Sequence, residues 1–146
     1  MIFMSKIIDL LKAVDPHHDI KKFDKIVSDI HMSGNRDDIV NLIYLLDDKS
    51  KCEEAMFTIV HTIETLPDVD YLNLIISKSS ELYNLCPIWM KTLLVRILNN
   101  EECYKSFQTL FSELNLPENH ALNCALHEIS INKPQFKQKI TSLKIR

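Results

Sequence analysis

The chain has 146 residues, of which 46% are hydrophobic and 25% charged, and its formal net charge at pH 7 is −3. A chain of this length can bury a full core without a disulfide framework or a structural metal ion. Its single glycine weighs against folds and sites built on glycine-rich turns, such as tight β-hairpins and phosphate-binding loops. We therefore expect an all-α protein with short connections.

Helical periodicity begins close to the N-terminus. The apolar spacing predicts a short helix over Ser5–Val14, which Pro16 ends. A second helix is predicted over Asp19–Met32, and Gly34 is placed to cap its C-terminus. These two helices form a first predicted hairpin over residues 5–32.

Three blocks of near-equal length follow, at residues 36–67, 68–100 and 101–133. Each block has the pattern helix, turn, helix, with the stronger apolar stripe on the second helix. Because one hairpin cannot bury its own apolar face, repeats of this length indicate stacked helical hairpins. The second helices are expected to form the inner layer, and residues 134–146 a C-terminal cap that contains a short helix over Phe136–Leu143.

Local signals predict where the helices of these blocks begin and end. The first block opens with a helix over Asp37–Leu46, and Ser50 with Glu53 predicts a capping box for its second helix. In the second block one helix is expected between Asp68 and Leu85. Pro87 is then expected at the first position of the next helix, where its missing N–H costs nothing.

Charge is distributed unevenly along the chain. Residues 37–128 hold fifteen acids and six bases, a net charge of −9, whereas residues 1–36 carry +1 and residues 129–146 carry +5. An acidic body disfavours nucleic acid as the partner, because affinity for nucleic acid comes from Lys and Arg neutralising phosphates. It favours a protein partner with a basic surface. For any single acid, a solvated helix N-terminus is an equally good explanation.

No constellation of residues predicts catalysis, a cofactor or a metal ion. His120 and His127 are seven residues apart and lack the spacing of a helical metal pair, and no serine lies in a GxSxG motif. The four cysteines form no CxxC pair, so we expect buried free thiols in a reducing cytosol. No signal peptide and no run of about 20 apolar residues is recognised, so a cytoplasmic protein without a membrane partner is expected.

Aromatic residues add candidates for a binding surface. Trp89, the only tryptophan, can either pack in the core or anchor an interface. Tyrosines lie on or beside the first helices of the second and third blocks, which are expected to face outward. The candidate partner contacts are acids and aromatics of the repeat body: Asp47, Asp48, Asp68, Asp70, Tyr71, Glu101, Glu102 and Tyr104.

Two segments carry a family resemblance. Cys86–Glu102 (CPIWMKTLLVRILNNEE) together with Ala121–Ser130 (ALNCALHEIS) resembles the immunity protein 30 family. Its members are small cytoplasmic helical proteins of bacterial contact-dependent inhibition and related polymorphic toxin systems. The resemblance is best over residues 82–105, weaker over 106–130, and only architectural over 1–81.

The resemblance implies a fold and a function. The implied fold is a HEAT-like, α-solenoid-like stack of antiparallel hairpins in a single domain over residues 1–146. The implied function is neutralisation of a cognate toxin with a basic surface, a nuclease, by stoichiometric binding that blocks its active site or substrate path. Two other interpretations stay open at this point: a general helical-repeat adaptor and an enzyme that uses the histidines.

Overall fold

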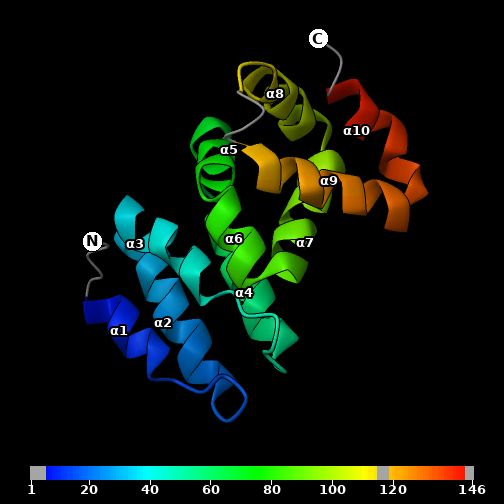
Figure 1. Ribbon diagram of the computed structural model, residues 1–146. Helices are drawn as coiled ribbons and strands as arrows, with labels where there is room; N and C mark the ends of the chain where they lie inside the picture. The colour runs from blue at the N-terminus through cyan, green and yellow to red at the C-terminus, as the bar shows by residue number, and fades with distance from the viewer. Residues whose placement is uncertain (1–5, 115–118, 144–146) are drawn as a thin grey trace. The chain divides into compact units, whose positions relative to one another are not determined.

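The computed structural model describes residues 6–114 and 119–143. Within these ranges all regular structure is helical and no strand occurs, which confirms the prediction of an all-α protein (Figure 1). No helix among these residues is both long enough and apolar enough to cross a bilayer. The chain divides into two compact units, Met1–Pro67 and Asp68–Arg146, which are described in turn.

In the described part of the first unit, residues 6–67, the regular structure consists of five helical segments. They are α1 (Lys6–Lys12), α2 (Ile20–Ser33), α3 (Arg36–Asn41), the 3₁₀ segment η1 (Leu42–Leu45) and α4 (Glu53–Ile63). The helix α2 packs against α1, α3 and α4, and η1 also contacts α4. Apolar side chains from all five segments fill the space between them, and the fully or almost fully buried ones include Ile8, Leu11, Val27, Ile30, Leu42, Ile43, Ile59, Val60 and Ile63.

Side chains and one glycine set the ends of α2. Asp19 accepts a hydrogen bond from the backbone N–H of Lys22 at 3.1 Å, so it satisfies one of the free donors of the first turn. Gly34 follows the helix with φ of 69° and donates to the carbonyl of His31. The prediction that Gly34 caps this helix is therefore confirmed.

The start of α4 differs from its prediction. The capping box is wrong, because the helix begins at Glu53 and places Cys52 at the position of the cap. Ser50 lies two residues before the cap position, and its hydroxyl accepts a hydrogen bond from the backbone N–H of Cys52 at 3.2 Å. The preceding helix is also shorter than expected, since α3 ends at Asn41 and η1 replaces its last turn.

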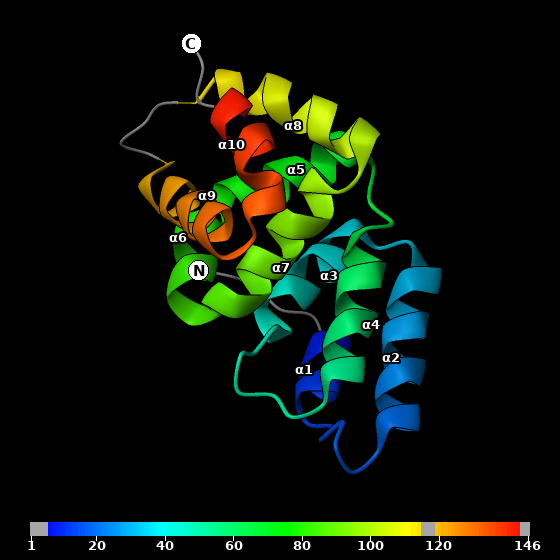
Figure 2. The ribbon, with the colours of Figure 1, turned by 90° about the vertical axis from the view of Figure 1, so that its right-hand side faces the viewer.

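The second unit is organised around one central helix. Its helical segments are α5 (Asp68–Ser77), α6 (Ser79–Leu85), α7 (Pro87–Leu98), α8 (Glu101–Ser112), α9 (His120–Asn132), η3 (Pro134–Phe136) and α10 (Lys137–Leu143). The helix α7 packs against α6, α8 and α9, while α10 contacts both α8 and α9 (Figure 2). The buried residues of α7 are Trp89, Met90, Leu93, Leu94, Ile97 and Leu98.

Two sequence signals in this unit have opposite outcomes. Pro87 is the first residue of α7, as predicted. The single helix expected between Asp68 and Leu85 is wrong, because Lys78 interrupts it between α5 and α6. Just before this break, the Ser77 hydroxyl donates to the carbonyl oxygen of Leu74 at 3.2 Å.

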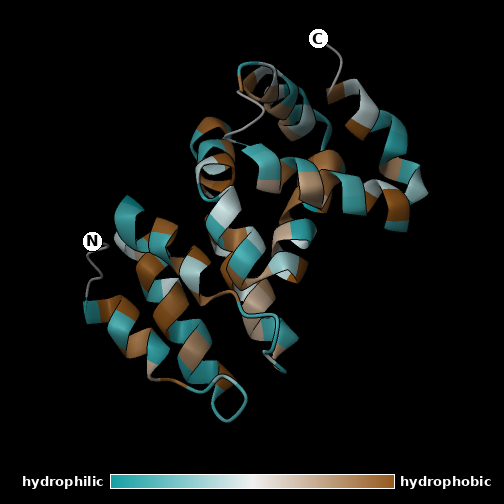
Figure 3. Ribbon diagram, in the orientation of Figure 1, coloured by the Kyte–Doolittle hydropathy of each residue, from teal (hydrophilic) through white to brown (hydrophobic). Residues whose placement is uncertain are grey.

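The amphipathic pattern is visible along the helices of both units. Hydrophobic residues recur about once per turn, between stretches of hydrophilic residues (Figure 3). In α9, for example, Leu122, Ala125, Leu126 and Ile129 are buried. Each unit therefore encloses its own apolar core and, among the described residues, leaves its charged side chains at least partly exposed, apart from Asp38, which is 8% exposed.

Candidate functional site

Two connections meet at one end of the first unit. The α1–α2 and η1–α4 connections both lie at this end (Figure 2), and the Cys52 Sγ lies 3.8 Å from the carbonyl oxygen of Pro16. A groove of about 220 Å³ opens beside them. Its lining is mixed, with apolar residues such as Leu11 and Met56 beside the polar residue Asp47.

Acidic side chains surround the η1–α4 connection. Asp47 is exposed and accepts a hydrogen bond from the backbone N–H of Lys49 at 2.9 Å, which fixes the direction of its carboxylate. Asp48 is half-buried, and Glu53 and Glu54 are exposed in the first turn of α4. The two aspartates predicted as partner contacts here thus differ in the surface that they offer.

The other predicted acids lie at two helix N-termini in the second unit. Asp68 is exposed and Asp70 half-buried in the first turn of α5, and Glu101 and Glu102 are exposed in the first turn of α8. The helices α5 and α8 pack against each other. Carboxylates in a first turn stabilise the helix through its dipole, so these acids have a structural use besides any contact with a partner.

The two predicted aromatic contacts are buried instead. Tyr71 is 3% exposed and Tyr104 is 7% exposed. Burial raises the pKa of Tyr104, whose hydroxyl donates to the carbonyl oxygen of Lys139 at 2.8 Å. Both rings fill the interior of the second unit and leave little surface for a partner. Trp89 likewise packs in the core.

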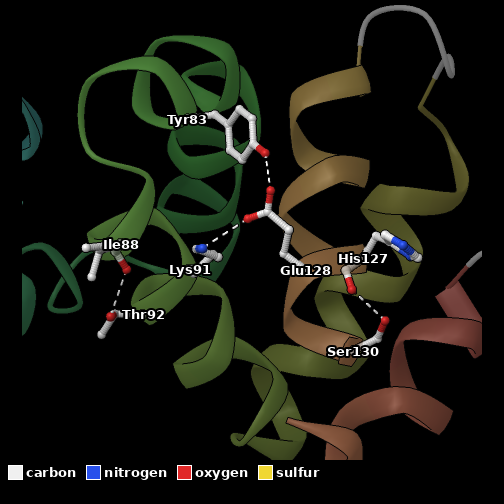
Figure 4. A network of polar contacts seen from close by, with 7 residues as sticks. All are labelled: Tyr83, Ile88, Lys91, Thr92, His127, Glu128 and Ser130. Carbon is white, nitrogen blue, oxygen red and sulfur yellow. Dashed lines mark hydrogen bonds and ion pairs between the residues drawn. The ribbon is translucent and has the colours of Figure 1, made fainter. Parts of the chain in front are cut away.

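The structure also contains a polar network that the sequence does not reveal. Tyr83 of α6 donates to Oε1 of Glu128 on α9, and Nζ of Lys91 on α7 donates to its Oε2 at 3.0 Å (Figure 4). The hydrogen bonds from Tyr83 and Lys91 lower the pKa of Glu128. The hydrogen bond to Glu128, together with desolvation, raises the pKa of Tyr83. No local pattern could have found this cluster, because its members are far apart in the sequence.

A second groove, of about 320 Å³, lies next to this network. It runs between α7 and α9, which contact each other. Apolar side chains of both helices line it, together with two lysines, one of which is Lys91 of the network.

The described residues hold no group of three or more His, Cys, Asp or Glu side chains placed to bind a metal ion. None of the four cysteines forms a disulfide; Cys86 and Cys103 are buried, and Cys52 and Cys124 are half-buried. Cys124 Sγ lies 3.5 Å from Nε2 of His120 on the exposed side of α9.

Comparison with known proteins gives one family. No curated protein and no solved structure matches the chain. The family model described as immunity protein 30 matches residues 10–107. The match runs from α1 into α8, so it includes Cys86–Glu102 but not Ala121–Ser130, and it extends over the N-terminal part where the sequence suggests only a shared architecture. Because the match covers more than half of the chain, the protein belongs to the immunity protein 30 family and is an immunity protein against a toxin.

Proposed function

We propose that the protein binds its cognate toxin in the cytoplasm and holds it inactive, and that this toxin is a nuclease delivered by contact-dependent inhibition. Membership of the family supports the immunity role. The nature of the toxin is inferred from charge. A nuclease needs a basic cleft to hold the phosphates of its substrate, so an acidic inhibitor can compete for the same surface.

The observation that carries this proposal is the exposure of acidic side chains in both units. Asp47, Asp68, Glu101 and Glu102 are all exposed, so their carboxylates can meet a basic surface without rearrangement of the core. Charged groups of this kind accelerate association and select the partner more than they add to its affinity. The half-buried Asp48 and Asp70 are also proposed as contacts with the toxin. Tyr71 and Tyr104 are buried, so they would contribute only by packing beneath the contact surface.

Inhibition in this proposal is occlusion, without chemistry. The inhibitor covers the active site or the path of the substrate, and toxin activity falls in proportion to the inhibitor added until the two are equimolar. Immunity proteins of this kind are generally not enzymes. A titration that reaches full inhibition far below one inhibitor per toxin would contradict this mechanism.

The test begins with the toxin domain encoded beside this protein in its own genome. The purified toxin domain is assayed for cleavage of plasmid DNA and of structured RNA, with and without the inhibitor. Cleavage that the inhibitor stops supports the proposal. A toxin domain that is inhibited but cleaves neither nucleic acid would overturn the assignment of a nuclease.

The electrostatic part is tested with charge-neutral variants. We expect the combined variant Asp47→Asn, Asp68→Asn, Glu101→Gln and Glu102→Gln to bind the toxin about tenfold more weakly, and with a smaller salt dependence, since each exposed ion pair contributes up to about 1 kcal/mol. Glu113→Gln is the matched control, because Glu113 is also exposed but lies at the C-terminal end of α8. Equal affinity and equal salt dependence of the combined variant and the control would remove the electrostatic argument.

A further inference from the structure

Apolar and polar side chains together line the groove between α7 and α9, and among the apolar ones Ile88 is exposed whereas Ile129 is buried. It is lined on α7 by Ile88, Lys91, Thr92 and Val95, on α9 by Ile129 and Asn132, and by Lys133, which follows the end of α9. The α7 residues have the spacing of a single helix face, and so do those of α9. The groove is open to solvent and is not a closed cavity.

The most unusual member of this lining is Ile88. Its exposed fraction is 59%, whereas α7 buries most of its other apolar side chains. Leu85, which ends α6 three residues earlier, is also exposed, at 68%. Exposed large apolar side chains beside a groove are typical of a site where another protein docks.

The charges at this groove have the opposite sign to those of the acidic contact set. No acid lines it, and its two charged members are Lys91 and Lys133. The ammonium of Lys91 donates to Glu128 at 3.0 Å, and this bond uses one of the three N–H donors of the ammonium. Lys133 is exposed, and it begins a stretch, residues 133–143, that contains further lysines and no acid.

We propose that this groove receives a helical segment of the cognate toxin that carries apolar side chains and carboxylates. Two helices that flank an apolar groove suit a third helix, which inserts side chains from one face. The flanking lysines then select acidic residues beside that apolar face. The identity of the occupant rests on the proposed function, and the inference adds a second contact of opposite polarity to the one made by the exposed acids.

The groove can be tested without the toxin, using a synthetic probe. The probe is a fluorescently labelled amphipathic peptide of about 18 residues, with Leu on one face and Glu on the other. A second peptide has the same Leu face and Lys in place of Glu. We expect the Leu/Glu peptide to bind the purified full chain and the Leu/Lys peptide to bind at least about tenfold more weakly.

Two variants and their matched controls locate the binding. Ile88→Ser should weaken binding of the Leu/Glu peptide about tenfold, whereas Ile131→Ser should not, because Ile131 is 63% exposed but does not line the groove. Lys133→Glu should shift the preference toward the Leu/Lys peptide, and Lys105→Glu, at an exposed site on α8, should leave it unchanged. All four positions are exposed, so circular dichroism should show an unchanged fold.

Several results would overturn the inference. They are equal binding of the two peptides, equal effects of Ile88→Ser and Ile131→Ser, or sedimentation showing that two copies of the chain cover the groove with each other. Toxin binding separates this inference from the proposed function. If the acid-to-amide variants weaken toxin binding and Ile88→Ser does not, the toxin does not use the groove and the proposed function is unaffected. If Ile88→Ser weakens binding to a toxin that is not a nuclease, the result supports toxin binding in the groove and overturns the nuclease assignment.

Discussion

Tyr104 and Lys139 hold α8 and α10 together by reciprocal contacts. The Tyr104 hydroxyl donates to the carbonyl oxygen of Lys139 at 2.8 Å, and the ammonium of Lys139 lies 4.9 Å from the centroid of the tyrosine ring. The same ammonium donates to the carbonyl oxygen of Leu98 at 2.7 Å. Leu98 ends α7, so a positive charge sits at the negative end of that helix dipole.

Removing the Tyr104 hydroxyl should destabilise the protein less than removing the Lys139 ammonium. We expect Tyr104→Phe to lower the free energy of unfolding by about 1 kcal/mol, since it removes one buried hydrogen bond and keeps the ring. Lys139→Met should cost about 1–2 kcal/mol, because it removes the bond to Leu98, the contact with the ring and the charge at the helix end. Urea unfolding of each variant measures these values.

The two changes should be almost additive, because the tyrosine hydroxyl binds the backbone of Lys139 and not its side chain. Lys137→Met is the control, since Lys137 is exposed on the same helix. A loss at Lys137 as large as that at Lys139 would show that the contacts of Lys139 are not what stabilises α10.

The network around Glu128 predicts a specific pH dependence of stability. Because hydrogen bonds from Tyr83 and Lys91 lower the pKa of Glu128 below its ordinary value of 4.5, the ionised carboxylate stabilises the folded state above that value. This contribution is lost as the pH falls below 4.5 through the lowered pKa. Glu128→Gln should therefore lose stability at neutral pH and approach the unmodified protein in acid.

At alkaline pH the same network acts through Tyr83. Its pKa is raised above 10.0, so its contribution is complete below pH 10.0 and is lost as the pH rises through the raised pKa. Unfolding curves across both ranges test these signs, with Glu81→Gln as a control at an exposed carboxylate of α6. A stability difference between Glu128→Gln and the unmodified protein that does not vary with pH would contradict the assignment.

Gly34 gives a test of backbone conformation alone. It has φ of 69°, and a Cβ added there would have no atom within 4 Å. We expect Gly34→Ala to destabilise the first unit by about 1–2 kcal/mol, since the left-handed conformation is unfavourable for a residue with a Cβ. Thermal unfolding measures the loss, and Gly34→Asn should lose less because Asn tolerates this conformation better. Equal losses for the two variants would point to a cause other than backbone conformation.

Burial predicts which cysteines react in the folded protein. Cys52 and Cys124 are half-buried, so they should react with a maleimide under native conditions. Cys86 and Cys103 are buried and should become labelled only when the protein opens. Mass spectrometry of timed samples identifies the labelled residues. Fast labelling of Cys86 in the native protein would show that the start of α7 opens locally.

Signals confined to a few neighbouring residues predict this fold well. Gly34 and Pro87 are each found at the helix end that their own backbone geometry favours. The failures at Ser50 and Lys78 are also local: Ser50 bonds the backbone N–H of Cys52 two residues on, and Lys78 separates two helices that the apolar pattern had joined. The HEAT-like stacking of hairpins and the single-domain organisation stay predictions.

Candidate contacts were harder to predict, because exposure depends on packing between distant segments. The exposed acids at α8 follow from their position in a first turn, but the burial of Tyr104 depends on α10, 35 residues later. Tyr83 and Glu128 are 45 residues apart, and neither has a neighbour in sequence that marks it. A tyrosine suits an interior with one polar partner as well as it suits an interface, so its type alone does not decide.

The bonds from α7 to α9 and α10 determine whether a shortened version of this protein can stay folded. The family match ends at Phe107, inside α8, whereas Lys91 and the last turn of α7 bind Glu128 and Lys139, which come later. A fragment cut at that boundary would leave part of the apolar surface of α7 open to water. We expect this fragment to aggregate, because it would expose the apolar surface of α7 that α9 covers in the full chain.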